Sequence, residues 1–161
     1  MNNAALYRKA VVWIALISLG LLAVMGWAQT NPAASTIDAA HLISPQDLVK
    51  ALQSGSPEKP LVINVGFHVL YTQAHIPGSE YIGPASSLAG LQQLHKRVEP
   101  LSRKQSIVLY CGCCPWSHCP NVGAAFKELA GMGFTNLKVV YLPDNFGTNW
   151  VDKGFPVLKG E

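Results

Sequence analysis

The sequence has few charged residues and no run of charge of one sign. Lysine and arginine together number 12, and aspartate and glutamate number 9, in a chain of 161 residues. Nucleic-acid surfaces and polybasic membrane surfaces need clustered basic side chains, so neither kind of partner is expected. The chain also lacks internal repeats and low-complexity tracts. Its length therefore predicts one domain.

The N-terminal 28 residues contain no acidic side chain. Arg8 and Lys9 precede an uncharged stretch, residues 10–28, which ends in Gly26-Trp27-Ala28. A basic start, an apolar run and a small-x-small end are typical of a secretory signal peptide. The alternative is an uncleaved membrane anchor, because residues 10–28 are just long enough to span a bilayer. Both interpretations export the domain, to the periplasm or outside the cell.

The rest of the chain is predicted to be a linker, residues 29–40, followed by one domain, residues 41–158. Short apolar runs predict buried strands, and stripes of apolar residues at helical spacing predict helices between them. The strands are expected at 41–43, 60–66, 79–82, 105–110 and 136–142, and the helices at 44–55, 86–98 and 120–134. Alternating strands and helices indicate an α/β domain with a mainly parallel sheet.

Cysteine is absent from the chain except within residues 111–119. Disulfides between such close positions would close only short loops and would add little stability. The four thiols are therefore expected to serve chemistry. They are Cys111, Cys113, Cys114 and Cys119.

Cys111 directly follows the predicted strand 105–110, and Pro120 begins the next helix. In parallel sheets the chemistry lies at the carboxyl ends of the strands. A helix N-terminus and a glycine-containing loop both stabilise a thiolate. We therefore expect a lowered pKa for Cys111, with the loop 112–119 as a cradle for an anion.

Three chemistries suit this loop. The first is sulfur transfer through a persulfide on Cys111. The second is a redox pair formed by Cys111 and Cys114, which have C-x-x-C spacing. The third is a soft metal such as Zn²⁺ or Cu(I), bound through thiolates and His118; it is disfavoured because one loop with two adjacent cysteines would have to supply every ligand. Phosphate transfer is disfavoured because no arginine or lysine lies between Cys111 and Phe126.

Several stretches resemble the rhodanese family. They are "VINVGFHVLYTQAHIPGSEYIG" at 62–83, "IVLYC" at 107–111, "AAFKELAGMGFTNLKVV" at 124–140 and "NWVDKGFPV" at 149–157. The resemblance implies a rhodanese-like fold, with a five-stranded parallel sheet flanked by helices on both faces. It also implies that Cys111 is the nucleophile that carries the persulfide. His75 and Trp150 are expected to be structural.

Two departures from the family pattern concern charge. The Asp and Arg that end one strand in the family are Asn64 and Gly66 here, and the loop after Cys111 is longer and has no arginine. The loss of cations disfavours a dianionic donor such as thiosulfate. The added thiols can attack a persulfide on Cys111 and release sulfide.

The sequence thus predicts an exported sulfurtransferase or persulfide carrier. The protein is expected to be a monomer without a cofactor or resident metal. Its expected partners are a small sulfane-sulfur donor and a thiol acceptor, or a protein thiol. Two alternatives stay open: a thiol–disulfide oxidoreductase, and a non-catalytic interaction domain with a disulfide such as Cys114–Cys119. His68 is a further candidate at the same end of the sheet. The predicted active-site loop comprises Gly112, Cys113, Cys114, Pro115, Trp116, Ser117, His118 and Cys119, of which Cys113, Cys114 and Cys119 are candidates to resolve the persulfide or to form a disulfide.

Overall fold

The computed structural model describes residues 36–55 and 59–160. The predicted signal peptide or anchor, residues 1–28, and most of the predicted linker lie outside these residues. In the described part of the chain, no helix combines the length and the apolar character needed to cross a membrane.

Within the described residues, five short strands alternate with helices. The strands are β1 (Leu42–Ile43), β2 (Leu61–Asn64), β3 (Glu80–Tyr81), β4 (Ile107–Tyr110) and β5 (Leu137–Val140). The α-helices are α2 (Pro45–Gln53), α3 (His68–Gln73), α4 (Leu88–Val98) and α5 (Pro120–Gly131). Three shorter helical segments are η2 (Ala39–His41), η3 (Trp116–His118) and η4 (Gly147–Val151).

The strands form one sheet in the order β1-β5-β4-β2-β3. Every neighbouring pair is parallel, so the predicted α/β fold with a five-stranded sheet is confirmed. Strand β4 lies in the centre, between β2 and β5. The carboxyl ends of β2 and β4 are in register, with Asn64 opposite Tyr110. A side chain that follows β4 therefore lies at the middle of the sheet edge where α/β proteins bind ligands.

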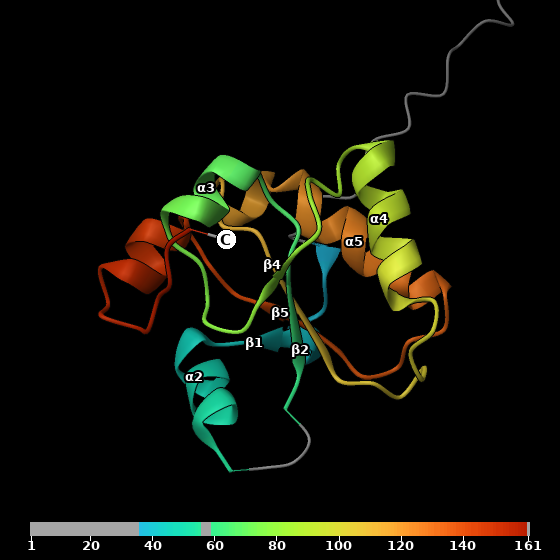
Figure 1. The fold of residues 1–161 in the computed structure, drawn as a ribbon, viewed down its shortest axis with the longest axis horizontal. Coiled ribbons are helices and arrows are strands. Elements are labelled where there is room, and N and C mark those ends of the chain that lie inside the picture. Colours follow the sequence, from blue (N-terminus) through green and yellow to red (C-terminus); the bar gives the residue numbers. More distant parts are fainter. Residues whose placement is uncertain (1–35, 56–58, 161) are drawn as a thin grey trace, which may run out of the picture. The chain divides into compact units, whose positions relative to one another are not determined.

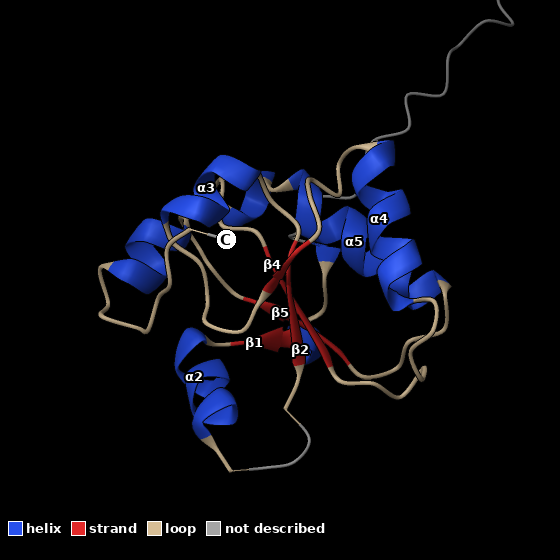
Figure 2. Cartoon of the chain, viewed as in Figure 1, coloured by secondary structure: helices blue, strands red, loops and turns tan. Residues whose placement is uncertain are grey.

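Two hydrophobic cores lie on the two faces of the sheet. Because strand side chains alternate between faces, Ile107 and Leu109 belong to one core, whereas Val108 and Tyr110 belong to the other. Helices α4 and α5 cover the first face, and α2 and η4 cover the second (Figure 1). With the strands drawn in red, Figure 2 shows the sheet between these helices. The predicted helices on both faces are thus confirmed.

Helix α3 was not predicted from the sequence. It has six residues, its N-cap residue Phe67 makes no capping side-chain hydrogen bond, and only Tyr71 among its side chains is buried. So short a segment cannot show a helical period, and its stability comes from packing at the end of β2. This helix places Tyr71 and Gln73 beside the site described next.

Candidate active site

Cys111 lies at the carboxyl end of the central strand β4 and is only 6% exposed. The next residue, Gly112, has φ +73°, a left-handed conformation that glycine adopts without strain. A Cβ atom at Gly112 would also lie 2.6 Å from the Cβ of Phe146. Gly112 thus allows the chain to turn sharply beneath Phe146 and to bring Cys113 back toward Cys111.

Three thiols converge at this turn, and we call Cys111, Cys113 and Cys119 the thiol cluster. The Sγ atoms of Cys111 and Cys113 are 3.1 Å apart. All three sulfur atoms lie within 4.8 Å of one another. Cys111 and Cys119 are buried, whereas Cys113 is partly exposed. The four cysteines of the chain are all free thiols in the structure.

Asn121 directs its side-chain amide at the thiol cluster. Its side chain is fully buried, and its Oδ1 accepts a hydrogen bond from the backbone N–H of Ser86 at 2.9 Å. This contact orients Nδ2, which donates to the sulfur atoms of Cys111 at 3.4 Å and Cys113 at 3.6 Å. Sequence analysis missed Asn121. Its one signal was an asparagine directly after the Cys-Pro that begins a helix.

The thiols of the cluster shift one another's pKa values, in opposite directions at Cys113 and Cys111. Hydrogen bonds from the thiols of Cys111, Cys119 and Cys114, together with the Asn121 amide, lower the pKa of Cys113. The same hydrogen bond to Cys113, the contact with Cys119 and burial raise the pKa of Cys111. The predicted lowered pKa of Cys111 is therefore wrong. A thiol that donates to a neighbouring thiolate keeps its own proton, because two adjacent negative charges repel each other.

The N-terminus of α5 acts on Cys119 rather than on Cys111. Cys119 is the N-cap residue of α5, although its side chain makes no capping hydrogen bond. A hydrogen bond with Cys111 and the N–H groups of Val122 and Asn121 lower the pKa of Cys119, but the hydrogen bond with Cys113 and burial outweigh them and the net shift is upward. The helix thus acts on the cluster at Cys119 and not at its predicted target, Cys111.

The predicted anion cradle of loop 112–119 is only partly available. The backbone N–H of Trp116 donates to the carbonyl of Pro143, that of His118 to Pro115, and that of Cys119 to Trp116. These three N–H groups are used within the fold and cannot bind an anion.

Among the remaining predicted loop side chains, Cys114 contacts the edge of the cluster, and the others pack elsewhere or are exposed. The Cys114 sulfur lies 3.3 Å from that of Cys113 but outside the set of sulfurs that all lie within 4.8 Å of one another. His118 is exposed and contacts the hydroxyl of Ser117 through Nδ1. Trp116 packs edge-on against Tyr141. Pro115 is exposed and precedes η3.

The histidines predicted to lie elsewhere have structural contacts. His75 is buried, stacks on Tyr71 and pairs its backbone with Leu158. His68 packs against Tyr81 at the start of α3. Trp150 is fully buried and donates its indole N–H to the carbonyl of Pro156. The structural roles expected for His75 and Trp150 agree with these positions.

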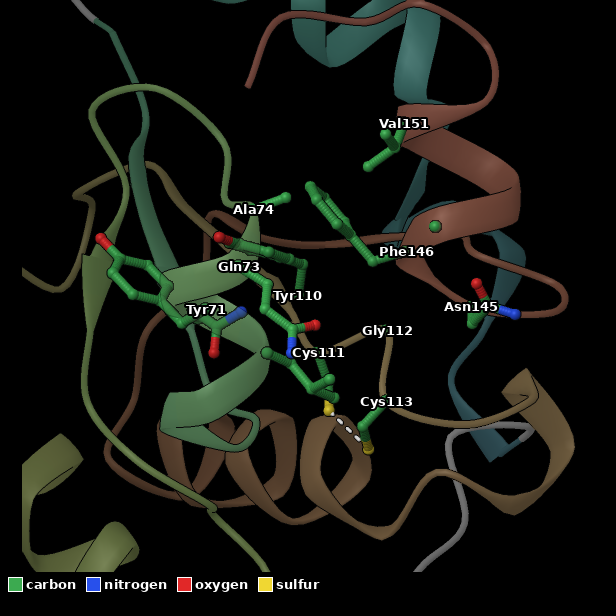
Figure 3. A pocket seen from close by; sticks show the side chains of 13 residues that line it. Tyr71, Gln73, Ala74, Tyr110, Cys111, Gly112, Cys113, Asn145, Phe146 and Val151 are labelled. Atoms are coloured by element: carbon green, nitrogen blue, oxygen red, sulfur yellow. Dashed lines mark hydrogen bonds between the residues drawn. The ribbon is translucent and has the colours of Figure 1, made fainter. Parts of the chain in front are cut away.

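A pocket of about 400 Å³ opens onto Cys111 and Cys113. Figure 3 shows Gln73 and Tyr110 on one side of it, Phe146 and Val151 on another, and the two sulfur atoms at its end. None of the residues that line this pocket is a lysine or an arginine. The arrangement can therefore accept a small molecule with little negative charge and present it to a sulfur nucleophile.

Comparisons with known proteins agree with this architecture. A family model described as a rhodanese-like domain matches residues 44–144. The curated proteins contain no match to the chain. Among solved structures, the chain is similar to the Alr3790 protein of Anabaena sp., with 16% identity, a TM-score of 0.56, and coverage of 73% of this chain and 92% of that one.

Two further solved structures show the same likeness. The BH2092 protein of Bacillus halodurans has 20% identity and a TM-score of 0.54, over 74% of this chain and 77% of that chain. The single-domain sulfurtransferase RDL2 of Saccharomyces cerevisiae has 15% identity and a TM-score of 0.53, over 74% of this chain and 94% of that chain. At these identities the likeness concerns the fold.

Proposed function

The chain belongs to the rhodanese-like domain family, and from this premise we propose that it transfers or carries sulfane sulfur as a persulfide on Cys111. The observation that supports this proposal best is the position of Cys111. Cys111 follows the central strand and lines the pocket, and its sulfur lies 3.1 Å from the Cys113 sulfur. One of the structural neighbours, from yeast, is itself described as a single-domain sulfurtransferase.

The first step loads the enzyme. The Cys111 thiolate attacks the sulfane sulfur of a donor while Cys113, 3.1 Å away, holds the proton that the two thiols share, and the bond between the sulfane sulfur and the leaving group breaks. The leaving group departs with the electron pair of that bond, and Cys111 becomes a persulfide. Cys113, in contact with Cys111, thus holds the proton that Cys111 must lose in order to react.

The second step returns the sulfur. An acceptor thiolate attacks the outer sulfur of the persulfide and restores Cys111. In a competing route, Cys113 attacks the inner sulfur, forms a Cys111–Cys113 disulfide and releases sulfide, and an external thiol then reduces the disulfide. The 3.1 Å separation favours Cys113 over Cys114 for this route.

We also propose that the domain acts outside the cytoplasm as a monomer. The support is the sequence pattern of residues 1–28, which lie outside the described residues. Its partners would be a small sulfane-sulfur donor and a thiol, on a small molecule or on a protein.

Intact mass spectrometry tests the proposal. The reduced protein is incubated with a sulfane-sulfur donor, and the gain of about 32 Da per sulfur atom is mapped to one cysteine. We expect the gain on Cys111, its loss in Cys111→Ser, and its transfer to an added thiol. In Cys113→Ser the uptake should persist, and sulfide release through the Cys111–Cys113 disulfide should stop.

Two outcomes would contradict this function. Sulfur uptake mapped to Cys113 would make Cys113 the nucleophile. A mass loss of about 2 Da without any sulfur uptake, reversed by a reductant, would favour the thiol–disulfide alternative.

A further inference from the structure

The geometry of the thiol cluster points to a second function beyond sulfur transfer. We propose that Cys111, Cys113 and Cys119 together bind one Cu(I) ion through three thiolates. No other residue is needed as a ligand, and the three sulfurs already lie within 4.8 Å of one another.

The spacing of the sulfurs suits a single ion. A thiolate-bound metal ion of this size lies about 2.3 Å from each sulfur. Three sulfurs around one ion in a plane are then about 4.0 Å apart, from the geometry of an equilateral triangle with that radius. The observed separations extend from 3.1 Å between Cys111 and Cys113 up to a limit of 4.8 Å. Side-chain rotations that move each sulfur by less than 1 Å would make the three sulfur–sulfur distances equal.

The number and type of donors select Cu(I) over Zn²⁺. Structural zinc sites almost always have four ligands, whereas soft thiolates alone are a preferred environment of Cu(I). Cys114 lies outside the three-sulfur set, and the His118 ring is exposed and bonded to Ser117. The strain expected of a four-ligand loop with adjacent cysteines does not arise here, because only Cys113 of the adjacent pair takes part.

The surroundings are those of a site that holds negative sulfur. Fully buried Asn121 directs its amide N–H groups at two of the three sulfurs. The N-terminus of α5 lies at the third, Cys119. Cu(I) binds thiolates, so binding displaces thiol protons. The affinity should therefore fall as the pH falls.

Access to the cluster is through the pocket that Figure 3 shows. Cys113 is partly exposed and borders this pocket together with Cys111. Since Cys111 is also the proposed sulfur acceptor, Cu(I) and sulfane sulfur should exclude each other. The metal proposal does not depend on sulfur transfer, because binding can be measured without a sulfur donor.

The test is an anaerobic titration of the reduced protein with Cu(I) against a coloured competing chelator. We expect one ion per chain and, by X-ray absorption, three sulfur neighbours at one distance. Single replacements Cys111→Ser, Cys113→Ser and Cys119→Ser should each weaken binding by about 100-fold or more, and Asn121→Ala by about tenfold, as for loss of an outer-shell partner. Cys114→Ser and His118→Ala should bind as the unmodified protein does.

Several results would overturn the assignment. One is the absence of stoichiometric binding. Another is loss of affinity in Cys114→Ser or His118→Ala, which would mean a different ligand set. Tighter binding of Zn²⁺ with four ligands would mean that the cluster is a zinc site and not a Cu(I) site. Circular dichroism checks that each variant folds, and Cys119→Ala, which keeps a small apolar group at this buried position, replaces Cys119→Ser if that variant does not.

Discussion

At the scale of single residues, Asn121 decides how easily the thiol cluster holds a negative charge. Its Nδ2 lies 3.4 Å from the Cys111 sulfur and 3.6 Å from the Cys113 sulfur. Hydrogen bonds to a charged group contribute about 1.5–3 kcal/mol. Asn121→Ala should therefore raise the pH at which Cys113 is half-alkylated, by about one unit or more.

The measurement is the rate of alkylation of the reduced protein against pH, with the modified cysteine mapped by mass. Asn136→Ala is the matched control, because Asn136 is exposed and follows α5 at the start of β5. It should leave the profile unchanged. An unchanged profile in Asn121→Ala would show that the buried amide does not stabilise the thiolate.

Tyr110 gives the stability of the fold a dependence on alkaline pH. Burial raises the pKa of Tyr110 to about 12, even though its hydroxyl contacts the Ser79 Oγ at 2.9 Å and accepts from the backbone N–H of Ile76. The folded-state pKa is higher than the unfolded one, about 10. Its contribution is therefore fully present below pH 10 and is lost as the pH rises to 12. A pKa difference of two units corresponds to about 3 kcal/mol in the free energy of unfolding.

Tyr110→Phe isolates this contribution when it is compared with the unmodified protein. At pH 8 the variant should be less stable by about 1 kcal/mol or more, because it loses the hydrogen bonds of the hydroxyl. Between pH 10 and 12 the difference should shrink and then reverse, since phenylalanine has no proton to lose. Urea unfolding of both proteins under reducing conditions measures it. A difference that stays constant over this range would contradict the raised pKa.

Sequence analysis could place Cys111 but not the charge of its cluster. Tyr110 and Cys111 end a run of β-forming residues, so the position of Cys111 at the sheet edge followed from the pattern. The distances from Cys113 and Cys119 to Cys111 depend on the turn at Gly112 and on η3, which no periodicity describes. The Asn121 amide is oriented by Ser86, 35 residues away in the chain. Such long-range contacts leave no local signal.

At the scale of elements, the contact between α4 and the turn before it depends on one glycine. A Cβ atom at Gly90 would lie 2.1 Å from the carbonyl oxygen of Pro84. Since backbone is the obstacle, α4 itself would have to move. Gly90→Ala should destabilise the fold by about 3 kcal/mol, at the upper end of overpacking costs.

Gly131 is the matched control for this prediction. It is the last residue of α5, and a Cβ atom there would meet nothing within 4 Å. Gly131→Ala should stabilise the protein by about 0.5–1 kcal/mol through helix propensity alone. Denaturant unfolding of both variants measures the two shifts. Equal shifts in the same direction would mean that the close approach at Gly90 does not constrain α4.

The elements that sequence analysis found are those with a local physical signal. Ser44 accepts a hydrogen bond from the backbone N–H of Asp47 and Pro45 begins α2, and both residue types are typical of a helix start. The buried strands β2, β4 and β5 were evident from their continuous apolar runs. Helix α3 was missed because its six residues depend on tertiary packing.

At the scale of the whole molecule, the scarcity of cations extends to the pocket. The ion pair between Arg97 and Glu80 lies on α4 and β3, at residues that do not line the pocket. Gly66 lies two residues after the end of β2, next to the site. A Cβ atom at Gly66 would lie 3.0 Å from the Cys111 sulfur. A basic side chain cannot be added there without crowding the nucleophile. The pocket thus has no charge that would attract a dianion.

Since no cation lines the pocket, the choice of sulfur donor should depend on donor charge. We expect faster sulfur uptake from an uncharged organic polysulfide than from thiosulfate. Gln73 is exposed and borders the pocket near Cys111 (Figure 3), so it offers a place to add a charge. Gln73→Arg should raise the rate with thiosulfate by up to about fivefold, the equivalent of about 1 kcal/mol for an exposed pair. That gain should vanish at high salt, be absent in the uncharged control Gln73→Met and not appear with the uncharged donor. If the unmodified protein already prefers thiosulfate, the dianion must be held by backbone N–H groups, and the argument from missing cations fails.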